Sequence, residues 1–393
     1  MRCEEKIKDC FASLAMTVQV IRQQATSNQQ PATSSKQPVT INKAISNDIM
    51  QKERLYGKTL NELITVAKRI GLPGFAAKQI SDWLYKKEIQ TIDEMTNLSK
   101  KTRELLSVDY EIGLSAPVNE SISSDGTKKY LFKVLNDKFI ETAYIPDDDR
   151  ATICVSSQAG CKMGCIFCMT GKQGFQGNLT ANEILNQFRS LPDFKSLTNM
   201  VYMGMGEPLD NINEVLKSLD ILTSEWGYAW SPTRITVSTI GLISGIKEFL
   251  EKSRCHLAVS LHSPFDEERR KLMPIQRTNT IKEVLDIIRN FDINSQRRVS
   301  FEYILFKGVN DTPAHIKELA RILNGIKCRI NIIRFHPIPG SEFQSPNMGM
   351  TINFKEALNA KGIFTTIRAS RGVDIQAACG LLSTLELNKT IQK

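Results

Sequence analysis

The sequence predicts an α/β protein with a parallel sheet, open or curled into a barrel, preceded by a small helical unit and several antiparallel strands. After residue 150, short apolar runs alternate with amphipathic stretches of helical length, which is typical of strands joined by helical crossovers. These runs cover residues 200–203, 235–238, 256–261, 299–305 and 329–333. A chain of 393 residues is long enough for one large domain and a smaller one.

The amino-terminal part divides into two segments. Residues 24–46 are rich in Ser, Thr, Gln and Pro and have no hydrophobic period, so we expect residues 1–54 to form a disordered polar arm. Helical patterns follow at 60–70 and 76–86, separated by a Gly-Leu-Pro-Gly turn, and a third follows near 98–106. We therefore expect a small helical accessory domain over residues 55–108.

Residues 110–145 alternate between apolar and polar side chains, which is the period of strands. Turn signals at Asp125-Gly126 and Asn136-Asp137 divide this stretch. We expect a β-strand region over 109–150, the main domain over 151–382 and a tail over 383–393.

The overall composition favours a cytoplasmic protein with a polyanionic partner. The net charge of +9 favours RNA, although mild basicity is common among soluble proteins. No apolar run approaches the ~20 residues that span a bilayer, and the first residues do not resemble a secretory signal. The 9 cysteines are more consistent with metal binding or catalysis in a reducing compartment than with a disulfide framework.

Three cysteines form the strongest motif. Cys161, Cys165 and Cys168 have C-x₃-C-x₂-C spacing, which suits three corners of a 4Fe-4S cluster and leaves one iron without a protein ligand. Zinc is the main alternative, with Cys154 as a fourth ligand. A structural zinc site usually takes two separated Cys pairs or Cys and His ligands, and no second Cys-x₂-Cys pair is present.

The neighbours of this motif agree with the cluster. Phe167 stands beside Cys168, and a Gly-Met-Gly-Glu-Pro turn at 204–208 follows one predicted strand. In a β/α barrel the carboxyl ends of the strands carry the chemistry, and residues 204–207, 238–241 and 260–262 all fall there. Together these features resemble the radical S-adenosylmethionine enzymes. That resemblance implies a partial (β/α)₆ barrel, a 4Fe-4S cluster and S-adenosylmethionine cleaved to a carbon radical at the open iron.

A narrower resemblance covers residues 55–382. The strings at 150–161, 171–180, 203–211 and 371–380 are similar to those of the RlmN/Cfr family of RNA methyltransferases. This resemblance implies that the helical unit binds RNA and that two S-adenosylmethionine molecules are used per turnover. Without this resemblance, the lysines of the helical unit would indicate only a solvent-exposed face of its helices.

The family resemblance implies three catalytic residues. Cys379 would accept a methyl group from one S-adenosylmethionine, and a radical made from the second would activate that methyl group for addition to adenine. Glu141 would remove the ring proton, and Cys154 would release the product by forming a disulfide with Cys379. Sequence pattern alone favours an outward-facing strand residue at Glu141 and a small buried side chain at Cys379. We also expect Arg371 to lower the pKa of the Cys379 thiol.

The same resemblance implies a set of S-adenosylmethionine contacts. These are Gly206, Glu207, Ser238, Ser260, Leu261, His262 and His336. His336 stands where the family has Asn, in a Pro-Ile-Pro-Gly turn, and imidazole can still donate or accept a hydrogen bond.

The expected substrates also follow from the resemblance. RlmN-type enzymes methylate C2 of an adenosine in the peptidyl-transferase centre of 23S rRNA and of a tRNA adenosine beside the anticodon. Cfr-type methylation of C8 of the same rRNA adenine is the alternative, and a non-catalytic, metal-containing RNA-binding protein is a further one. A reductant such as flavodoxin, a monomeric state and no membrane partner complete the expectation.

Overall fold

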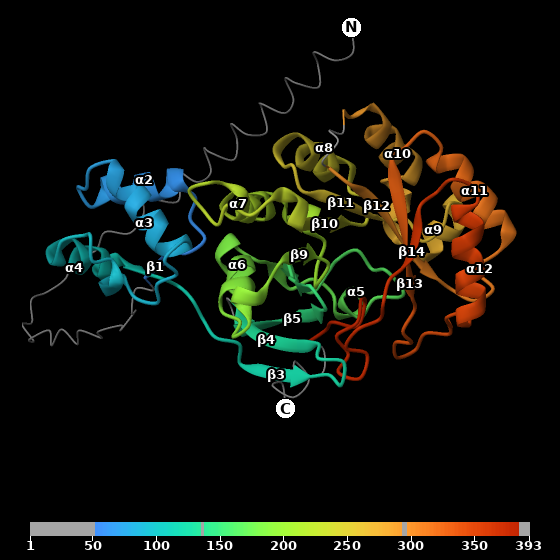
Figure 1. The fold of residues 1–393 in the computed structure, drawn as a ribbon, viewed down its shortest axis with the longest axis horizontal. Coiled ribbons are helices and arrows are strands. Elements are labelled where there is room, and N and C mark those ends of the chain that lie inside the picture. The colour runs from blue at the N-terminus through green and yellow to red at the C-terminus, as the bar shows by residue number, and fades with distance from the viewer. Residues whose placement is uncertain (1–51, 135–136, 293–296, 385–393) are drawn as a thin grey trace, which may run out of the picture. The chain divides into compact units, whose positions relative to one another are not determined.

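The computed structural model describes residues 52–134, 137–292 and 297–384. The predicted arm therefore lies almost entirely outside the described residues. Among the described residues, one large sheet has the strand order β14-β13-β12-β11-β10-β9-β6-β5-β4-β3 (Figure 1). No helix of this part is long and apolar enough to cross a membrane.

The strands have the following bounds: β1 Glu53–Arg54, β2 Tyr110–Glu111, β3 Asn119–Ile122, β4 Lys128–Val134, β5 Lys138–Asp147, β6 Arg150–Cys154, β7 Gln158–Ala159, β8 Gly177–Asn178, β9 Asn199–Tyr202, β10 Ile235–Thr239, β11 His256–Ser260, β12 Val299–Leu305, β13 Cys328–Arg334 and β14 Thr365–Ile367. The α-helices are α2 Leu60–Arg69, α3 Phe75–Tyr85, α4 Lys100–Asp109, α5 Met169–Gln173, α6 Ala181–Arg189, α7 Ile212–Thr223, α8 Ile243–Lys252, α9 Asp266–Leu272, α10 Ile281–Asn290, α11 Pro313–Leu323 and α12 Met348–Asn359.

The parallel part of the sheet confirms the predicted architecture. Strands β6 and β9 to β14 pair in parallel in sequence order, and helices connect them. Figure 1 shows α7, α8, α10, α11 and α12 around the outside of these strands. In the described residues this part has one strand more than the six expected, because the short β14 pairs with β13.

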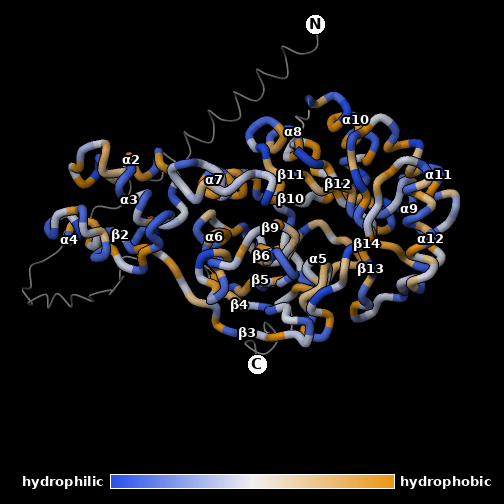
Figure 2. Tube along the Cα trace, in the orientation of Figure 1, coloured by the Kyte–Doolittle hydropathy of each residue, from blue (hydrophilic) through white to orange (hydrophobic). Residues whose placement is uncertain are grey.

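The core lies between the sheet and its helices. Strand β12 is buried along its whole length, as the sequence run 299–305 predicts for a strand covered on both faces. Figure 2 shows hydrophobic and hydrophilic residues alternating along helices such as α8 and α11, which have one face on the sheet and one in solvent.

The antiparallel strands β3 to β6 extend the sheet on one side. Their register places Leu131 opposite Glu141 and Ala143 opposite Cys154. Because β6 also pairs with β9, the strand that carries Glu141 is joined directly to the parallel part of the sheet.

The helical unit comprises α2, α3 and α4, close to the predicted ranges. Thr59 starts α2 with a capping box, since its side chain accepts from the Glu62 N–H and the Glu62 carboxylate accepts from the Thr59 N–H. Asn182 on α6 ties this unit to the barrel by donating to the carbonyl oxygens of Tyr56 at 3.0 Å and Gly113 at 2.9 Å.

The described structure extends past two predicted boundaries. Strand β1 lies before Leu55 and pairs in parallel with β2. Beyond residue 382, the Ser383 and Thr384 N–H groups donate to Glu141 and Gln173, at 2.8 and 2.9 Å.

Candidate active site

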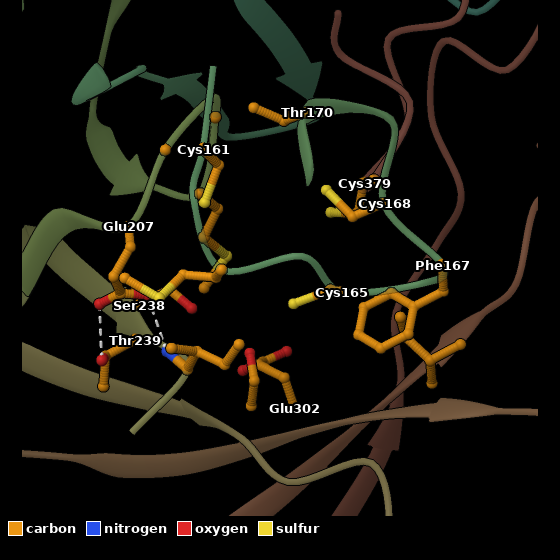
Figure 3. A pocket seen from close by; sticks show the side chains of 18 of the residues that line it. Cys161, Cys165, Phe167, Cys168, Thr170, Glu207, Ser238, Thr239, Glu302 and Cys379 are labelled. Atoms are coloured by element: carbon orange, nitrogen blue, oxygen red, sulfur yellow. Dashed lines mark hydrogen bonds between the residues drawn. The ribbon is translucent and has the colours of Figure 1, made fainter. Parts of the chain in front are cut away.

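The carboxyl ends of the parallel strands and the cysteine loop surround one cavity. Its wall contains most of the residues singled out in the sequence, as Figure 3 shows for several of them. They are Cys161, Cys165, Cys168, Gly206, Glu207, Ser238, Ser260, His262 and Cys379. We call this the cluster cavity. Strand ends far apart in the sequence meet here because parallel strands place their carboxyl ends at one edge.

The three clustered cysteines lie in a tight loop after β7. Gly160 has φ +69°, and a Cβ at this position would stand 1.7 Å from the Gly174 carbonyl oxygen. That carbonyl accepts from the Cys161 N–H at 3.2 Å, so the loop before the first cysteine closes against the end of α5. Glycine is required at this turn for both reasons.

The electrostatic environment of these three thiols favours the binding of a cationic group. Burial, then the Cys168 thiol, raises the pKa of Cys161 to about 12. Burial and the neighbouring cysteines raise the pKa of Cys165 as well. These groups are therefore neutral thiols on their own and would become thiolates only with positive charge between them, and soft sulfur is the ligand of iron-sulfur clusters. Among the described residues, no group of three or more His, Cys, Asp or Glu is arranged to hold a single metal ion.

Glu207 is a buried carboxylate held from several sides. Its Oε1 accepts from the Thr239 hydroxyl at 2.7 Å, and its Oε2 accepts from the Ile240 N–H at 2.9 Å. Burial raises the pKa of Glu207 to about 7, and these hydrogen bonds oppose the rise. The carboxylate is thus oriented in the cavity wall and suited to a cationic ligand such as an ammonium group.

His262 is a neutral hydrogen-bond donor. Burial, with the charge of Arg269, lowers the pKa of His262 to about 3. Its Nδ1 accepts from the Ile304 N–H at 3.0 Å, which leaves the proton on Nε2. The imidazole meets the Phe167 ring edge-on with 4.9 Å between centroids, which fixes its orientation beside the cysteine loop.

Arg269 holds the ends of two strands at the cavity, a role that the sequence did not suggest. This fully buried side chain donates to the carbonyl oxygens of Ile240 at 2.8 Å and Ser260 at 3.0 Å. It also donates to the carbonyl of Leu261 at 3.2 Å. Leu261 itself is buried and does not line the cluster cavity, so only its backbone contributes to the geometry of the site.

The segment around Cys379 packs against the cysteine loop. The Met169 N–H donates to the Gly380 carbonyl at 2.8 Å, and the Thr170 hydroxyl donates to the Leu382 carbonyl at 2.7 Å. Figure 3 shows Cys379 beside Cys168. Two cysteines far apart in the sequence therefore share one wall.

A second cavity meets the first at Cys379. We call it the resolving cavity; it is lined by Cys154, Cys379, Arg368 and His336, among others. Burial, then the Cys379 thiol, raises the pKa of Cys154 to about 12, while Arg368 opposes the rise. The charge of Cys379 in turn raises the pKa of Arg368. Of the cysteines that the sequence singled out, Cys379 is thus the one that lines both cavities.

The structure does not bring His336 into the cluster cavity. Its Nε2 lies 3.0 Å from the Ser370 hydroxyl, and its ring lines the resolving cavity instead. Burial, with the charge of Arg334, lowers the pKa of His336, so this imidazole is neutral.

Glu141 lies behind the cavity wall. It is 6% exposed, and its carboxylate pairs with Lys129 at 2.9 Å and accepts from the Ser383 N–H at 2.8 Å. Burial raises the pKa of Glu141, and the Lys129 charge partly offsets this. Leu382, the residue immediately before Ser383, lines both cavities. Glu141 thus lies next to the site without opening into it.

The expected partner of Cys379 needs correction. Arg371 pairs with Asp147 at 3.2 Å, whereas Arg368 is the guanidinium whose charge interacts with Cys379. Sequence reasoning also missed Lys129 and Glu302. The Glu302 side chain lines the cluster cavity, and its Oε2 has no hydrogen-bond partner among the described residues. A polar residue within an apolar strand was the available signal for Glu302.

Two family models match the chain. One, described as the radical SAM superfamily, matches residues 155–322, and one described as the ribosomal RNA large subunit methyltransferase N-terminal domain matches residues 54–112. The first range contains the cysteine loop and most of the parallel strands. The second coincides with the helical unit.

Individual relatives cover most of the chain. It is 59% identical over 335 residues to the probable dual-specificity RNA methyltransferase RlmN of Bacteroides fragilis (strain YCH46), spanning 85% of this chain and 97% of the relative. It is 44% identical to the dual-specificity RNA methyltransferase RlmN of Campylobacter fetus subsp. fetus (strain 82-40), spanning 79% and 93%. A crystal structure of a radical SAM methyltransferase from Sphaerobacter thermophilus matches with a TM-score of 0.78, 40% identity, and coverage of 84% and 98%.

Proposed function

Because the chain belongs to the RlmN family of radical S-adenosylmethionine RNA methyltransferases, we propose that it methylates C2 of an adenine in 23S rRNA and C2 of an adenine in tRNA. The proposed sites are the peptidyl-transferase centre and the tRNA position beside the anticodon. The relatives named as dual-specificity enzymes support two RNA substrates, and this chain spans nearly their whole length.

The cofactors of the family are a 4Fe-4S cluster and S-adenosylmethionine, two molecules of which are used per turnover. When bound, they supply the carbon radical that a non-nucleophilic ring carbon requires. We assign Cys161, Cys165 and Cys168 as the cluster ligands, because these three thiols share one cavity wall. Glu207 would hold the methionine ammonium, and the Nε2 proton of His262 would donate to the same cosubstrate.

The observation that carries the proposal is the position of Cys379. It lies where the cluster cavity and the resolving cavity meet, so a methyl group on its sulfur is accessible from both. Cys154 also lines the resolving cavity, which supports its proposed role: it would attack that sulfur and release the product as a disulfide forms. The raised pKa of Cys154 keeps it a neutral thiol before that step, which protects it from methylation.

Glu141 is the proposed acceptor of the ring proton. Burial raises its pKa toward the range useful for a base at neutral pH. Its carboxylate is bonded to the Ser383 N–H, so a shift of this segment would open it to the resolving cavity. His336 remains a proposed S-adenosylmethionine contact and would have to reach it from the resolving cavity.

We also propose that an electron donor such as flavodoxin reduces the enzyme. The enzyme would be a monomer and would act in the cytoplasm. Size-exclusion chromatography with light scattering tests the monomer.

The decisive experiment is mass spectrometry of nucleosides from rRNA and tRNA of cells with and without this protein. We expect 2-methyladenosine in both RNAs, lost on deletion and restored by the wild-type gene. Appearance of 8-methyladenosine instead would overturn the C2 assignment. Unchanged methylation in both RNAs would overturn the proposed substrates.

A further inference from the structure

A third cavity opens at the amino-terminal end of the parallel strands. Its volume is about 260 Å³, and five arginines line it: Arg234, Arg298, Arg329, Arg368 and Arg150, which pairs with Asp147. Arg234 directly precedes β10, Arg298 directly precedes β12, and Arg329 is the second residue of β13. In the strand register Arg329 stands beside Ser300. We call the side chains of Arg234, Arg298 and Arg329 the arginine mouth. It lies at the opposite edge of the sheet from the cysteine loop.

The charge of the arginine mouth is not balanced by acidic side chains. Across residues 52–134, 137–292 and 297–384, none of the three guanidinium groups has an ion pair or hydrogen bond to a carboxylate; Arg329 lies over the Phe364 ring, 5.3 Å from its centroid. The carboxylate that lines this cavity, Glu302, is 3% exposed and accepts from Ser300 and Asn331 through Oε1. A single buried carboxylate faces several cations here.

Neighbouring groups respond to this excess positive charge. Burial, then the charges of Arg298 and Arg329, lowers the pKa of His256 to about 4. Burial, then Arg298, also lowers the pKa of Arg329, although the charge of Glu302 opposes this. His256 thus stays neutral, and the like charges at the mouth repel one another. An anion between them would relieve that repulsion.

The cavity of the arginine mouth borders the resolving cavity. Met203 and Arg368 line both this cavity and the resolving cavity, which contains Cys154 and Cys379. Strand β12 has 7 residues, which at about 3.3 Å per residue spans roughly 20 Å between the two ends of the barrel. Because this is longer than one nucleotide, the phosphates that reach the arginines are those of the neighbouring nucleotides and not that of the nucleotide whose base lies at Cys379.

We propose that the arginine mouth binds the phosphodiester backbone of the RNA substrate beside the target adenine, an inference that rests on the proposed function. An adenine that leaves its stack must be held by its backbone, and guanidinium groups bind phosphate through paired hydrogen bonds. The site gives positioning and salt-dependent affinity. It does not read the sequence of the RNA.

The test uses the full-length, cluster-loaded protein and a fluorescent RNA hairpin with the sequence of a substrate anticodon stem-loop. Arg234 and Arg298 are exposed, so the double variant Arg234→Gln/Arg298→Gln leaves the core intact. We expect roughly tenfold weaker binding at about 0.1 M salt, and a slope of log affinity against log salt that is shallower by about 1 to 2. The variant Arg298→Lys keeps the charge and should keep the slope. Arg321→Gln, on the outer face of α11 and paired with Glu318, is the matched control.

The outcomes of this test distinguish a failure of the proposed phosphate site from a failure of the proposed function. If the wild type methylates RNA and the double variant binds the hairpin with unchanged affinity and slope, the arginine mouth is not the phosphate site. If the wild type neither binds nor methylates RNA, the proposed function is wrong as well. If inorganic phosphate raises the melting temperature of the wild type but not of the double variant, while RNA binding is the same in both, the site takes free phosphate and the RNA assignment is overturned.

Discussion

The backbone N–H of Met169 donates a hydrogen bond of 2.8 Å to the carbonyl oxygen of Gly380. Met169 directly follows Cys168, and Gly380 directly follows Cys379. This bond holds the proposed methyl carrier against the proposed cluster loop, so the two half-reactions can take place in adjoining cavities. The adjacent bond from Thr170 to Leu382 strengthens the same contact.

Replacing the methyl carrier should stop methylation without removing the cluster. We expect Cys379→Ala to lower RNA methylation by at least about 1,000-fold, as removal of a covalent nucleophile does. The reconstituted variant should still bind iron and cleave S-adenosylmethionine under a strong reductant. The measurement is tritium transfer to RNA, alongside deoxyadenosine by chromatography.

The matched control for that variant is Cys328→Ala, which removes a thiol of β13 packed against the main core. It should retain most methylation. RNA methylation by Cys379→Ala at the wild-type rate would exclude the two-cysteine scheme, whatever the state of the cluster.

Binding of S-adenosylmethionine should depend on pH through Glu207. Its pKa of about 7 means that the carboxyl is largely protonated near pH 6, whereas a methionine ammonium is charged and favours the carboxylate. We expect affinity to increase as pH rises from about 5.5 to 8, with proton release on binding at the acidic end. Calorimetry in two buffers of different ionisation enthalpy measures that proton.

Glu207→Gln should bind more weakly, by about tenfold or more, and with little pH dependence. The same group has a defined effect on the ligand-free protein. Its pKa is raised from 4.5 to about 7, so the folded chain holds this proton more tightly than the unfolded chain. The free energy of unfolding should therefore decline as pH rises through this window, and less so in Glu207→Gln. A wild-type affinity independent of pH would contradict the assigned role.

Lys129 should set the pH range in which Glu141 acts as a base. Its Nζ lies 2.9 Å from Oε1 of Glu141, and both side chains are largely buried. Without this charge the pKa of Glu141 rises further, so in Lys129→Gln the acidic limb of the pH–rate profile should move up by about one unit. The measurement is the initial rate of RNA methylation across pH.

Two variants distinguish this positioning role from a loss of stability. Lys129→Arg keeps a positive charge beside Glu141 and should keep the limb in place. Lys128→Gln removes the neighbouring lysine, which pairs with Asp193 at 2.7 Å, and should not move the limb. If the acidic limb of the pH–rate profile does not move in Lys129→Gln, Glu141 does not titrate in the pH range over which the rate changes.

The sequence was most informative where a local pattern determines the structure. The apolar runs predicted the parallel strands, and the cysteine spacing with the Gly-Met-Gly-Glu-Pro turn predicted one wall of the cluster cavity. These features depend on residues close together in the chain. The family resemblance added Cys154 and Cys379, which spacing alone leaves as ordinary buried thiols.

What could not be predicted depends on contacts between distant segments. Arg371 was expected beside Cys379, but the end of β14 directs Arg368 there, and Arg371 turns to Asp147. His336 follows β13 yet lines the resolving cavity. Lys129 meets Glu141 only through the register of β4 and β5, which a one-residue slip would abolish.

The last prediction concerns the glycine that precedes the first cluster cysteine. Gly160 has φ +69°, and an added Cβ would overlap the Gly174 carbonyl oxygen, a backbone atom that cannot move independently of the loop. Gly160→Ala should therefore displace Cys161, lower the iron bound after anaerobic reconstitution to less than half, and cost about 1 to 3 kcal/mol of unfolding free energy. Gly177→Ala is the matched control, because its Cβ would meet nothing within 4 Å and its φ is not positive. Full iron binding by Gly160→Ala would show that this turn does not position the cysteine loop.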